Sequence, residues 1–132
     1  MNSSAFIKKY AIQYLSKYDS TKKNLERVLK NKIKKMHDTK KNEKFFLYQS
    51  IFKIIEELES KQIINDKRYA NAKILFFSSV GKSKNFIKNY LLQKGIEKNL
   101  TDEIIYKFEL ENPQWEIESA NLNLIMKSMK TS

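Results

Sequence analysis

The stretch Ile63-Ile64-Asn65-Asp66-Lys67-Arg68-Tyr69-Ala70 predicts a junction between two helices. An apolar pair is followed by a polar pair, and a new apolar periodicity then begins. Asn65 and Asp66 have short side chains that accept hydrogen bonds from the free N–H groups of a first helical turn, so one of them is expected to cap the second helix. The isoleucine pair is expected to pack against Tyr69-Ala70 as a hydrophobic staple across the cap.

Helical patterns occur on both sides of this junction, because apolar residues recur at every third or fourth position. The 132 residues include two glycines and one proline, which leaves little of the turn chemistry that sheet hairpins require. We therefore expect an all-α protein. Its helices are expected at about 5–18, 21–36, 43–60, 66–79, 83–94, 101–111 and 114–130. The wide apolar arcs of the third and fourth helices predict that these two together form the hydrophobic centre.

Two helix ends can be predicted from single residues. Asp19 or Ser20 is expected to cap the second helix. Gly95 is expected to end the fifth helix in the left-handed conformation that glycine adopts readily.

The chain also contains an internal repeat. Shifting it by about 60 residues aligns Tyr10-Ala11 with Tyr69-Ala70, and each half then has three helices. This predicts tandem three-helix repeats, with repeat one at about 5–61, repeat two at about 65–111 and the first helix of a truncated third repeat at about 113–130. We expect residues 1–132 to form a single domain, an elongated helical array of a right-handed type.

The formal net charge of +11 arises from 26 basic and 15 acidic residues. Such an excess favours contact with a polyanion or an acidic protein surface. Nearly all the cations are lysines, and the scarcity of arginine argues against base-specific reading of DNA. A lysine-rich composition would produce the same excess without any binding role.

Four cations of the second predicted helix fall on one face, opposite its apolar stripe. We call Lys23, Arg27, Lys30 and Lys34 the basic ridge. It is interpreted either as a solvated face or as a contact surface for phosphates and carboxylates. Like charges at this spacing repel weakly, so the ridge is expected to be dispensable for folding. The corresponding candidates in the second repeat are Arg68, Lys84 and Lys88.

Catalytic and metal sites are not indicated. The chain has no cysteine, and its single histidine, His37, has no nucleophile or metal ligand spaced to meet it. Gly81-Lys82-Ser83 resembles the end of a phosphate-binding loop but lacks the upstream glycine and the preceding strand. The acidic segment from Asp102 to Glu118 is expected to be a solvated face. We expect no enzymatic activity, no cofactor and no metal.

The first residues lack the pattern of a secretory signal, and no apolar run approaches the length of a membrane span. We therefore expect a cytoplasmic protein that does not enter a membrane.

Several blocks, in this order and spacing, resemble the RecX family of recombination regulators. They are Tyr14-Leu15, Ser20, Asn24-Leu25-Glu26-Arg27-Val28-Leu29, Ile55, Leu58, the helix junction Ile63-Ile64-Asn65-Asp66-Lys67-Arg68-Tyr69-Ala70, Gly81-Lys82-Ser83, Ile87, Leu91 and Lys94-Gly95-Ile96. The resemblance covers about Tyr10 to Phe108. It departs from the family at Asn65, where the family usually has Asp, and in the truncated third repeat.

The resemblance implies a monomeric regulatory protein without catalytic residues that binds the RecA filament on DNA. It would inhibit or modulate RecA's ATP hydrolysis and strand exchange in recombination, DNA repair and the SOS response. The implied partners are the RecA filament and single- or double-stranded DNA without sequence preference. The residues alone leave open a nonspecific nucleic-acid-binding helical module that acts through its lysine-rich face. In either case the basic ridge, Arg68, Lys84 and Lys88 are the candidate binding residues.

Overall fold

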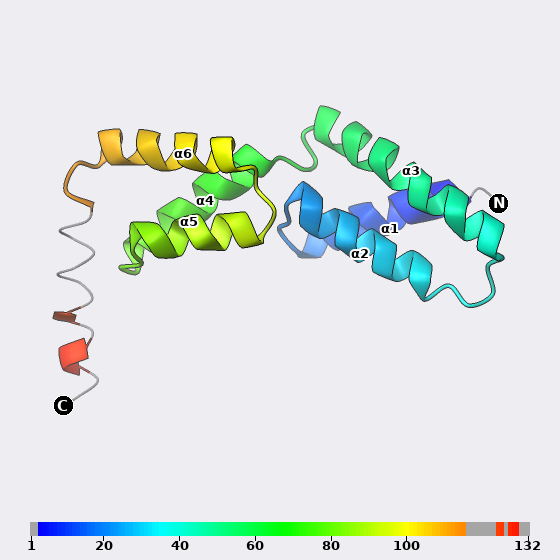
Figure 1. Cartoon of the computed structure of the whole chain (residues 1–132), viewed down its shortest axis with the longest axis horizontal. Coiled ribbons are helices and arrows are strands. Elements are labelled where there is room, and N and C mark those ends of the chain that lie inside the picture. The colour runs from blue at the N-terminus through cyan, green and yellow to red at the C-terminus, as the bar shows by residue number, and fades with distance from the viewer. Residues whose placement is uncertain (1–2, 116–123, 126, 130–132) are drawn as a thin grey trace. The chain divides into compact units, whose positions relative to one another are not determined.

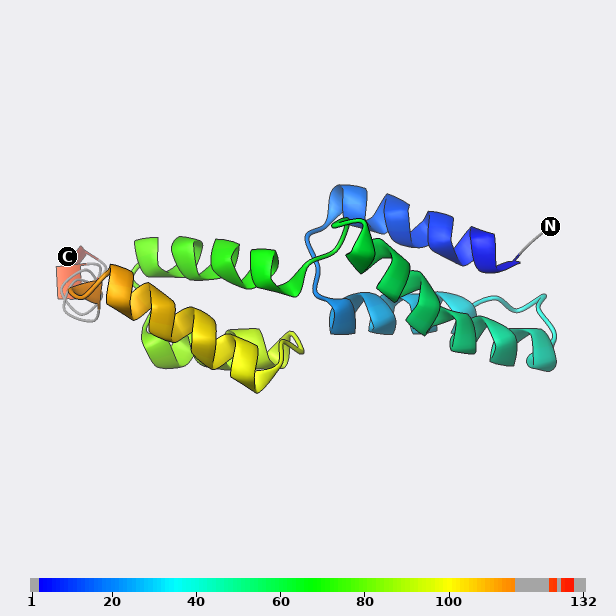
Figure 2. The same ribbon diagram turned by 90° about the horizontal axis from the view of Figure 1, so that it is seen from above.

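The computed structural model describes residues 3–115, 124–125 and 127–129, and the chain divides into two compact units between Asp66 and Lys67. The helices of unit 1 are α1 (Ser3–Lys17), α2 (Lys22–Lys34) and α3 (Lys41–Ser60). The chain then forms α4 (Asp66–Ser79), α5 (Lys84–Gln93) and α6 (Lys98–Glu111), which build unit 2 (Figure 1). Successive helices within each unit run in opposite directions (Figure 2).

The predicted all-helical fold with two three-helix units is therefore confirmed. Within the described ranges every regular element is a helix. The predicted third repeat at 113–130 lies largely outside the described residues. The repeat boundaries and the right-handed array stay predictions.

Unit 1 encloses an aliphatic core. It is formed by Ile7, Ala11, Leu25, Leu29, Ile33, Leu47, Ile51, Ile54, Ile55, Leu58 and Ile64. Two ion pairs join the last turns of α3 to its neighbours, one from Lys8 to Glu57 at 2.6 Å and one from Lys22 to Glu59 at 2.8 Å. The C-terminal half of α3 therefore holds both α1 and α2.

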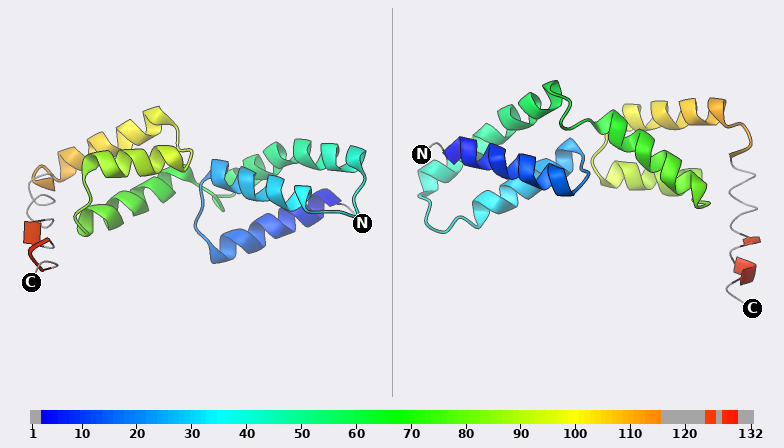
Figure 3. Two further views of the ribbon diagram at one scale, coloured as in Figure 1. Left: turned by 60° about the horizontal axis from the view of Figure 1, so that its bottom comes forward. Right: turned by 180° about the vertical axis from the view of Figure 1, so that it is seen from behind.

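Unit 2 has its own core, to which α4, α5 and α6 all contribute. Figure 3 shows these three helices side by side. It is formed by Tyr69, Ala70, Ile74, Ile87, Leu91, Ile96, Ile104, Ile105 and Trp115. Aromatic rings line its edge, where Phe77 packs edge to face against Phe86 and Tyr90 at centroid distances of 5.2 and 4.7 Å. Because α3 and α4 serve different cores, the prediction that they share one hydrophobic centre was wrong.

The junction differs from its predicted form for the same reason. Ile64 belongs to the core of unit 1, whereas Tyr69 and Ala70 belong to the core of unit 2, so the staple across the cap was wrongly predicted. Asp66 reaches back to α2, where its Oδ1 accepts a hydrogen bond from the Lys22 N–H at 2.9 Å. Asp66 was one of the two residues expected to cap the helix that follows. Its carboxylate accepts a hydrogen bond from a backbone N–H at the start of α2, which lies 44 residues earlier in the sequence.

The N-cap of α2 is Thr21, so the prediction of Asp19 or Ser20 was wrong by one or two positions. The Thr21 Oγ1 accepts from the Asn24 N–H at 3.1 Å. Ser83 does the same for α5, accepting from the Phe86 N–H at 3.1 Å. Corresponding helices of the two units thus begin with the same hydroxyl cap, which satisfies one of the free N–H groups of a first turn.

Three helices end with the same backbone motif. After α5, Gly95 has a φ of 84° and the Ile96 N–H bonds to the Leu91 carbonyl at 3.1 Å, as predicted for Gly95. Gly81 takes the equivalent position after α4. After α3 the position is filled by Gln62, whose φ of 59° lies in the left-handed region that disfavours a side chain.

We expect the substitution Gln62→Gly to stabilise unit 1. It removes a left-handed strain of about 1–2 kcal/mol and adds glycine's unfolded-state entropy of about 0.5–1 kcal/mol, which leaves a net gain between about 0 and 1.5 kcal/mol. Urea unfolding of the variant measures the gain. Gly95→Ala is the matched control and is expected to shift the midpoint the other way, and a loss of stability in Gln62→Gly would contradict the strain.

The carboxyl of Asp66 supplies a second test. Burial raises the pKa of Asp66, and the hydrogen bond from the Lys22 N–H and the Lys22 charge only partly oppose this. Asp66→Ala leaves that N–H without its acceptor and is expected to cost about 1 kcal/mol. Asp66→Asn keeps an acceptor without the buried charge, so it is expected to be at least as stable as the wild type at neutral pH.

The pH dependence follows from the raised pKa. Below neutral pH the folded wild type takes up a proton at Asp66 before the unfolded chain does, which stabilises the wild type. The advantage of Asp66→Asn over the wild type should therefore shrink as pH falls through the raised pKa. Urea unfolding at a series of pH values measures it, and an advantage that grew on acidification would contradict the assignment.

Candidate interaction surface

The basic ridge lies where the sequence predicted it. Lys23, Arg27, Lys30 and Lys34 are all exposed on α2, whereas Leu25, Leu29 and Ile33 face the core. The 3.6-residue period therefore separates the cations of this helix from its apolar stripe. The ridge is available to a partner without any rearrangement of the core.

A carboxylate that the sequence interpretation did not use lies within this ridge. Glu26 pairs with Lys30 at 2.9 Å and with Lys23 at 3.6 Å. The hydrogen bond from Lys30, followed by the Lys23 charge, outweighs desolvation and lowers the pKa of Glu26, so Glu26 stays ionised to a lower pH than an ordinary glutamate. Glu26 therefore offsets part of the repulsion expected along the ridge.

Arg27 is oriented by its own helix. Its guanidinium donates to the Asn24 Oδ1 at 3.0 Å. The Asn24 side chain in turn donates to the Ser20 Oγ at 2.9 Å and contacts the Tyr14 hydroxyl at 3.4 Å. This chain of polar groups starts from a buried serine and links the ridge to α1, so Asn24 is a positioning residue.

The cations proposed for unit 2 have a different setting. Lys84 pairs with Glu109 at 2.5 Å and Lys88 pairs with Asp102 at 3.3 Å, and all four side chains are partly buried. These pairs connect α5 to α6 and offset the charge of both lysines, and Asp102 and Glu109 are not simply a solvated acidic face. Arg68 is exposed in the first turn of α4. Whether any of the seven candidates binds a partner stays a prediction.

Lys32 of α2 contacts two aromatic rings of α1. The Lys32 ammonium lies 4.9 Å from the centroid of Tyr10 and 5.7 Å from that of Phe6, both on α1. Such a contact lets the aliphatic stem cover apolar surface while the charge meets the ring faces. Helical spacing alone could not show this pairing, whereas the Glu26–Lys30 pair follows from a spacing of four residues.

The described residues contain no group of three or more His, Asp or Glu side chains that could hold a metal ion. The helices seen there are also too short or too polar to cross a membrane. What the surface offers is charge and exposed apolar area, which suit binding to another macromolecule.

The fold and this surface place the chain among all-helical proteins built from tandem three-helix units. A scan of protein-family models gave no match, and no curated protein matched in sequence. Among solved structures it is similar to the crystal structure of the regulatory protein RecX, with a TM-score of 0.65 and 24% sequence identity over 89% of this chain. The chain spans about half of that structure, 53% of its length. The protein therefore has a RecX-like fold.

We expect Glu26→Gln to strengthen binding to a polyanion beyond the effect of one unit of charge, because it releases Lys23 and Lys30 from their shared partner. The salt concentration that elutes the protein from a heparin column measures this. The loss of two exposed pairs should lower stability by no more than about 0.5–1 kcal/mol.

Glu103→Gln is the matched control. Glu103 is exposed on α6, and its replacement changes the net charge equally. Equal shifts in the two variants would show that retention follows net charge alone and that Glu26 does not restrain the ridge.

Proposed function

We propose that this protein regulates the RecA recombinase by binding its filament on DNA, and that it thereby inhibits or modulates ATP hydrolysis and strand exchange. The observation that carries the proposal is the tandem three-helix fold shared with the regulatory protein RecX. The sequence blocks that resemble this family support it further. The proposal includes a role in recombination and repair, a cytoplasmic location and a monomeric protein that performs no chemistry of its own.

The basic ridge gives the proposal a physical basis. A nucleoprotein filament presents phosphates and acidic side chains, to which exposed cations are complementary. In the part of the chain that the structure describes, Lys23 and Lys30 pair with Glu26, whereas Arg27 and Lys34 form no ion pair with a carboxylate. Arg27 is held in place by Asn24. Arg27 and Lys34 are therefore proposed as the main contacts, with Lys23 and Lys30 contributing less while Glu26 is ionised.

The direct test is RecA's ATP hydrolysis on single-stranded DNA with increasing amounts of this protein. We expect the rate to change at amounts below one molecule per RecA subunit, because a regulator on a filament affects several subunits. Strand exchange measured in parallel should change in the same direction. No effect on either reaction at a several-fold excess over RecA would rule the proposal out.

The same basic ridge favours a second candidate, a module that binds nucleic acid without sequence preference. Such a module would bind bare DNA with a steep salt dependence and would gain no affinity from RecA. Comparing affinity for bare single-stranded DNA with affinity for the same DNA coated by RecA separates the two. Tighter binding to the coated DNA supports regulation of RecA.

We expect Arg27→Gln with Lys34→Gln to weaken filament binding about tenfold, or about 1.4 kcal/mol, while the melting temperature stays nearly unchanged. Both residues are exposed and glutamine is a good helix former, so folding should tolerate the changes. Co-sedimentation with RecA filaments measures the binding.

The matched control is Lys9→Gln with Lys17→Gln, which removes the same charge from two exposed lysines of unit 1 outside the ridge. If both double variants lose affinity equally, binding depends on net charge and the ridge is a solvated face.

A further inference from the structure

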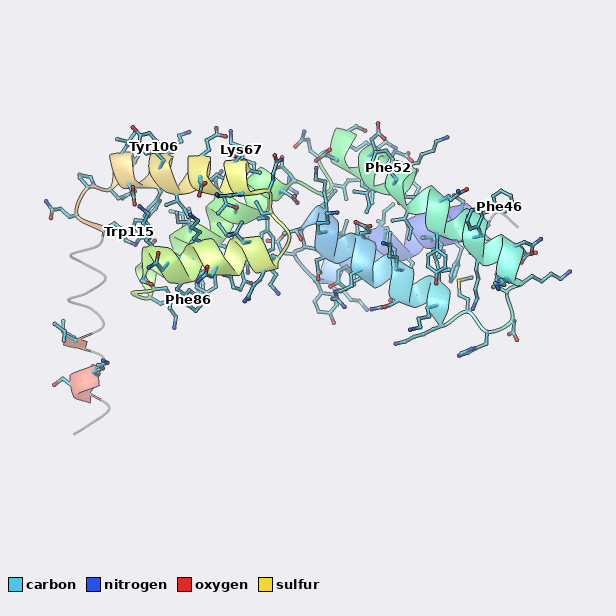
Figure 4. All side chains as sticks on the ribbon, viewed as in Figure 1. Phe46, Phe52, Lys67, Phe86, Tyr106 and Trp115 are labelled. Carbon is cyan, nitrogen blue, oxygen red and sulfur yellow. The ribbon has the colours of Figure 1, made fainter. Side chains whose placement is uncertain are left out.

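Helix α3 carries two apolar rows. Its aliphatic row lies in the core of unit 1 and consists of Leu47, Ile51, Ile54 and Leu58. A second row has the same alternating spacing of three and four residues, but it is exposed. It consists of Phe45, Tyr48 and Phe52, whose side chains are 59%, 37% and 74% exposed. We call these three residues the aromatic row. Figure 4 labels Phe52 and a further phenylalanine, Phe46, on this helix.

The spacing of the aromatic row indicates a helical partner. Apolar side chains three and four residues apart form a stripe along one face of a helix, and a second helix covers such a stripe with a stripe of its own. In unit 1, α1 and α2 cover the aliphatic row in this way. Exposed apolar surface that is gathered in one place marks an interaction site more often than scattered exposure does.

The charges of α3 are arranged symmetrically about the aromatic row. The helix has three lysines and four glutamates, so as a whole it selects neither an anionic nor a cationic partner. Lys41 precedes Phe45 by four residues, and Glu56 follows Phe52 by four residues. Both charged side chains are exposed. A cation and an anion therefore lie at equal distances on either side of the midpoint of the row.

An antiparallel pair of α3 helices from two copies of the chain satisfies both patterns. A two-fold axis at the midpoint of the aromatic row places Phe45 of one chain opposite Phe52 of its partner, and the two Tyr48 side chains meet at the axis. The same axis places Lys41 opposite Glu56 at both ends of the pair. Isologous contacts require a surface that complements itself, and opposite charges across such a contact fix its register.

We propose that the protein associates with a second copy of itself through the aromatic row of α3, in this antiparallel register. A single pair of helices buries less surface than a standard interface, so the dissociation constant is expected in the micromolar range or above. At lower concentrations the chain is the monomer of the proposed function. The association does not rest on that function, because it requires neither RecA nor DNA.

Sedimentation velocity at protein concentrations from about 1 µM to about 1 mM measures the association. At about 0.15 M salt the Debye length is about 8 Å, which limits the repulsion between two chains with a net charge of +11 each. We expect the wild type to change from monomer to dimer within this range. A monomer at every concentration would assign the aromatic row to a different partner and overturn the proposal.

The variant Phe52→Ala is expected to weaken the association at least tenfold, because each pair loses two central rings. Phe46→Ala is the matched control. Phe46 is 67% exposed on the same helix but lies about a third of a turn away from the aromatic row. Its removal should change the association constant by a factor of about two at most. Equal losses in the two variants would show unspecific apolar association and contradict the proposed row.

Charge reversal tests the register. Lys41→Glu and Glu56→Lys should each weaken the association about fivefold, because like charges then meet at both ends of the pair. The variant with both substitutions should regain the wild-type affinity, since opposite charges meet again. Lys41→Glu also lowers the net charge of the chain, so an effect of net charge alone would strengthen the association. That result, or a double variant without recovery, would refute the antiparallel pair.

A cysteine placed near the two-fold axis gives an independent readout. The sequence contains no cysteine, and Gln49 is exposed beside Tyr48. Gln49→Cys should therefore form a disulfide-linked dimer under mild oxidation, whereas the control Gln93→Cys, at an exposed position of α5, should remain mostly monomeric. Equal crosslinking of the two would count against the pair.

The substituted side chains are all exposed, so each variant should keep the wild-type melting temperature at about 1 µM, where the chain is monomeric. This is checked first. The ATP hydrolysis assay with RecA is a separate measurement, so a failure here is distinguishable from a failure of the proposed function.

Discussion

The arrangement of the helix ends in unit 1 depends on the hydrogen bond from the Lys22 N–H to the Asp66 carboxylate. It ties the first residue of α2 to the residue where α4 begins, and the Lys22 side chain adds an ion pair to Glu59 in the last turn of α3. The N-terminus of α2, the end of α3 and the chain that leaves unit 1 are thereby joined at one place. Because α2 is held at this end, the cations along its outer face are presented on a fixed support. Burial raises the pKa of Asp66, so this link is maintained against a desolvation cost.

Each unit has a small core, and local capping motifs define where its helices begin and end. Hydroxyl caps at Thr21 and Ser83 begin the middle helices, and left-handed residues end α3, α4 and α5. These local motifs satisfy backbone groups that would otherwise lose hydrogen bonds on folding. With a core on one side only, α2 and α3 each keep a free outer face. One presents cations and the other presents aromatic rings, so a single unit offers two surfaces of different chemistry.

The net charge of +11 overstates the positive charge that is available to a binding partner. Lys84 and Lys88 are engaged by carboxylates of α6, and Lys8 and Lys22 by carboxylates of α3. Glu26 pairs with two cations of the basic ridge. Exposed pairs of this kind contribute only about 0–1 kcal/mol to stability, but each reduces the local positive field. The field that remains on α2 is concentrated around Arg27 and Lys34, which is why these residues are central to the proposed binding of an anionic filament.

The sequence by itself determined the helices, their number per unit and the face of α2 that carries the basic ridge. These depend on local rules: a period of 3.6 residues, the scarcity of glycine and proline, and the left-handed preference of Gly95. Its order of blocks also indicated the RecX-like fold that the structure shows. The partners of Asp66, Glu59 and Glu109 lie far away in the sequence, and periodicity carries no information about such pairs. It likewise could not divide the apolar residues of α3 between a buried aliphatic row and a bare aromatic one. Only the tertiary structure decided these, because burial depends on which helices pack together, and each unit has three helices with which to cover its core.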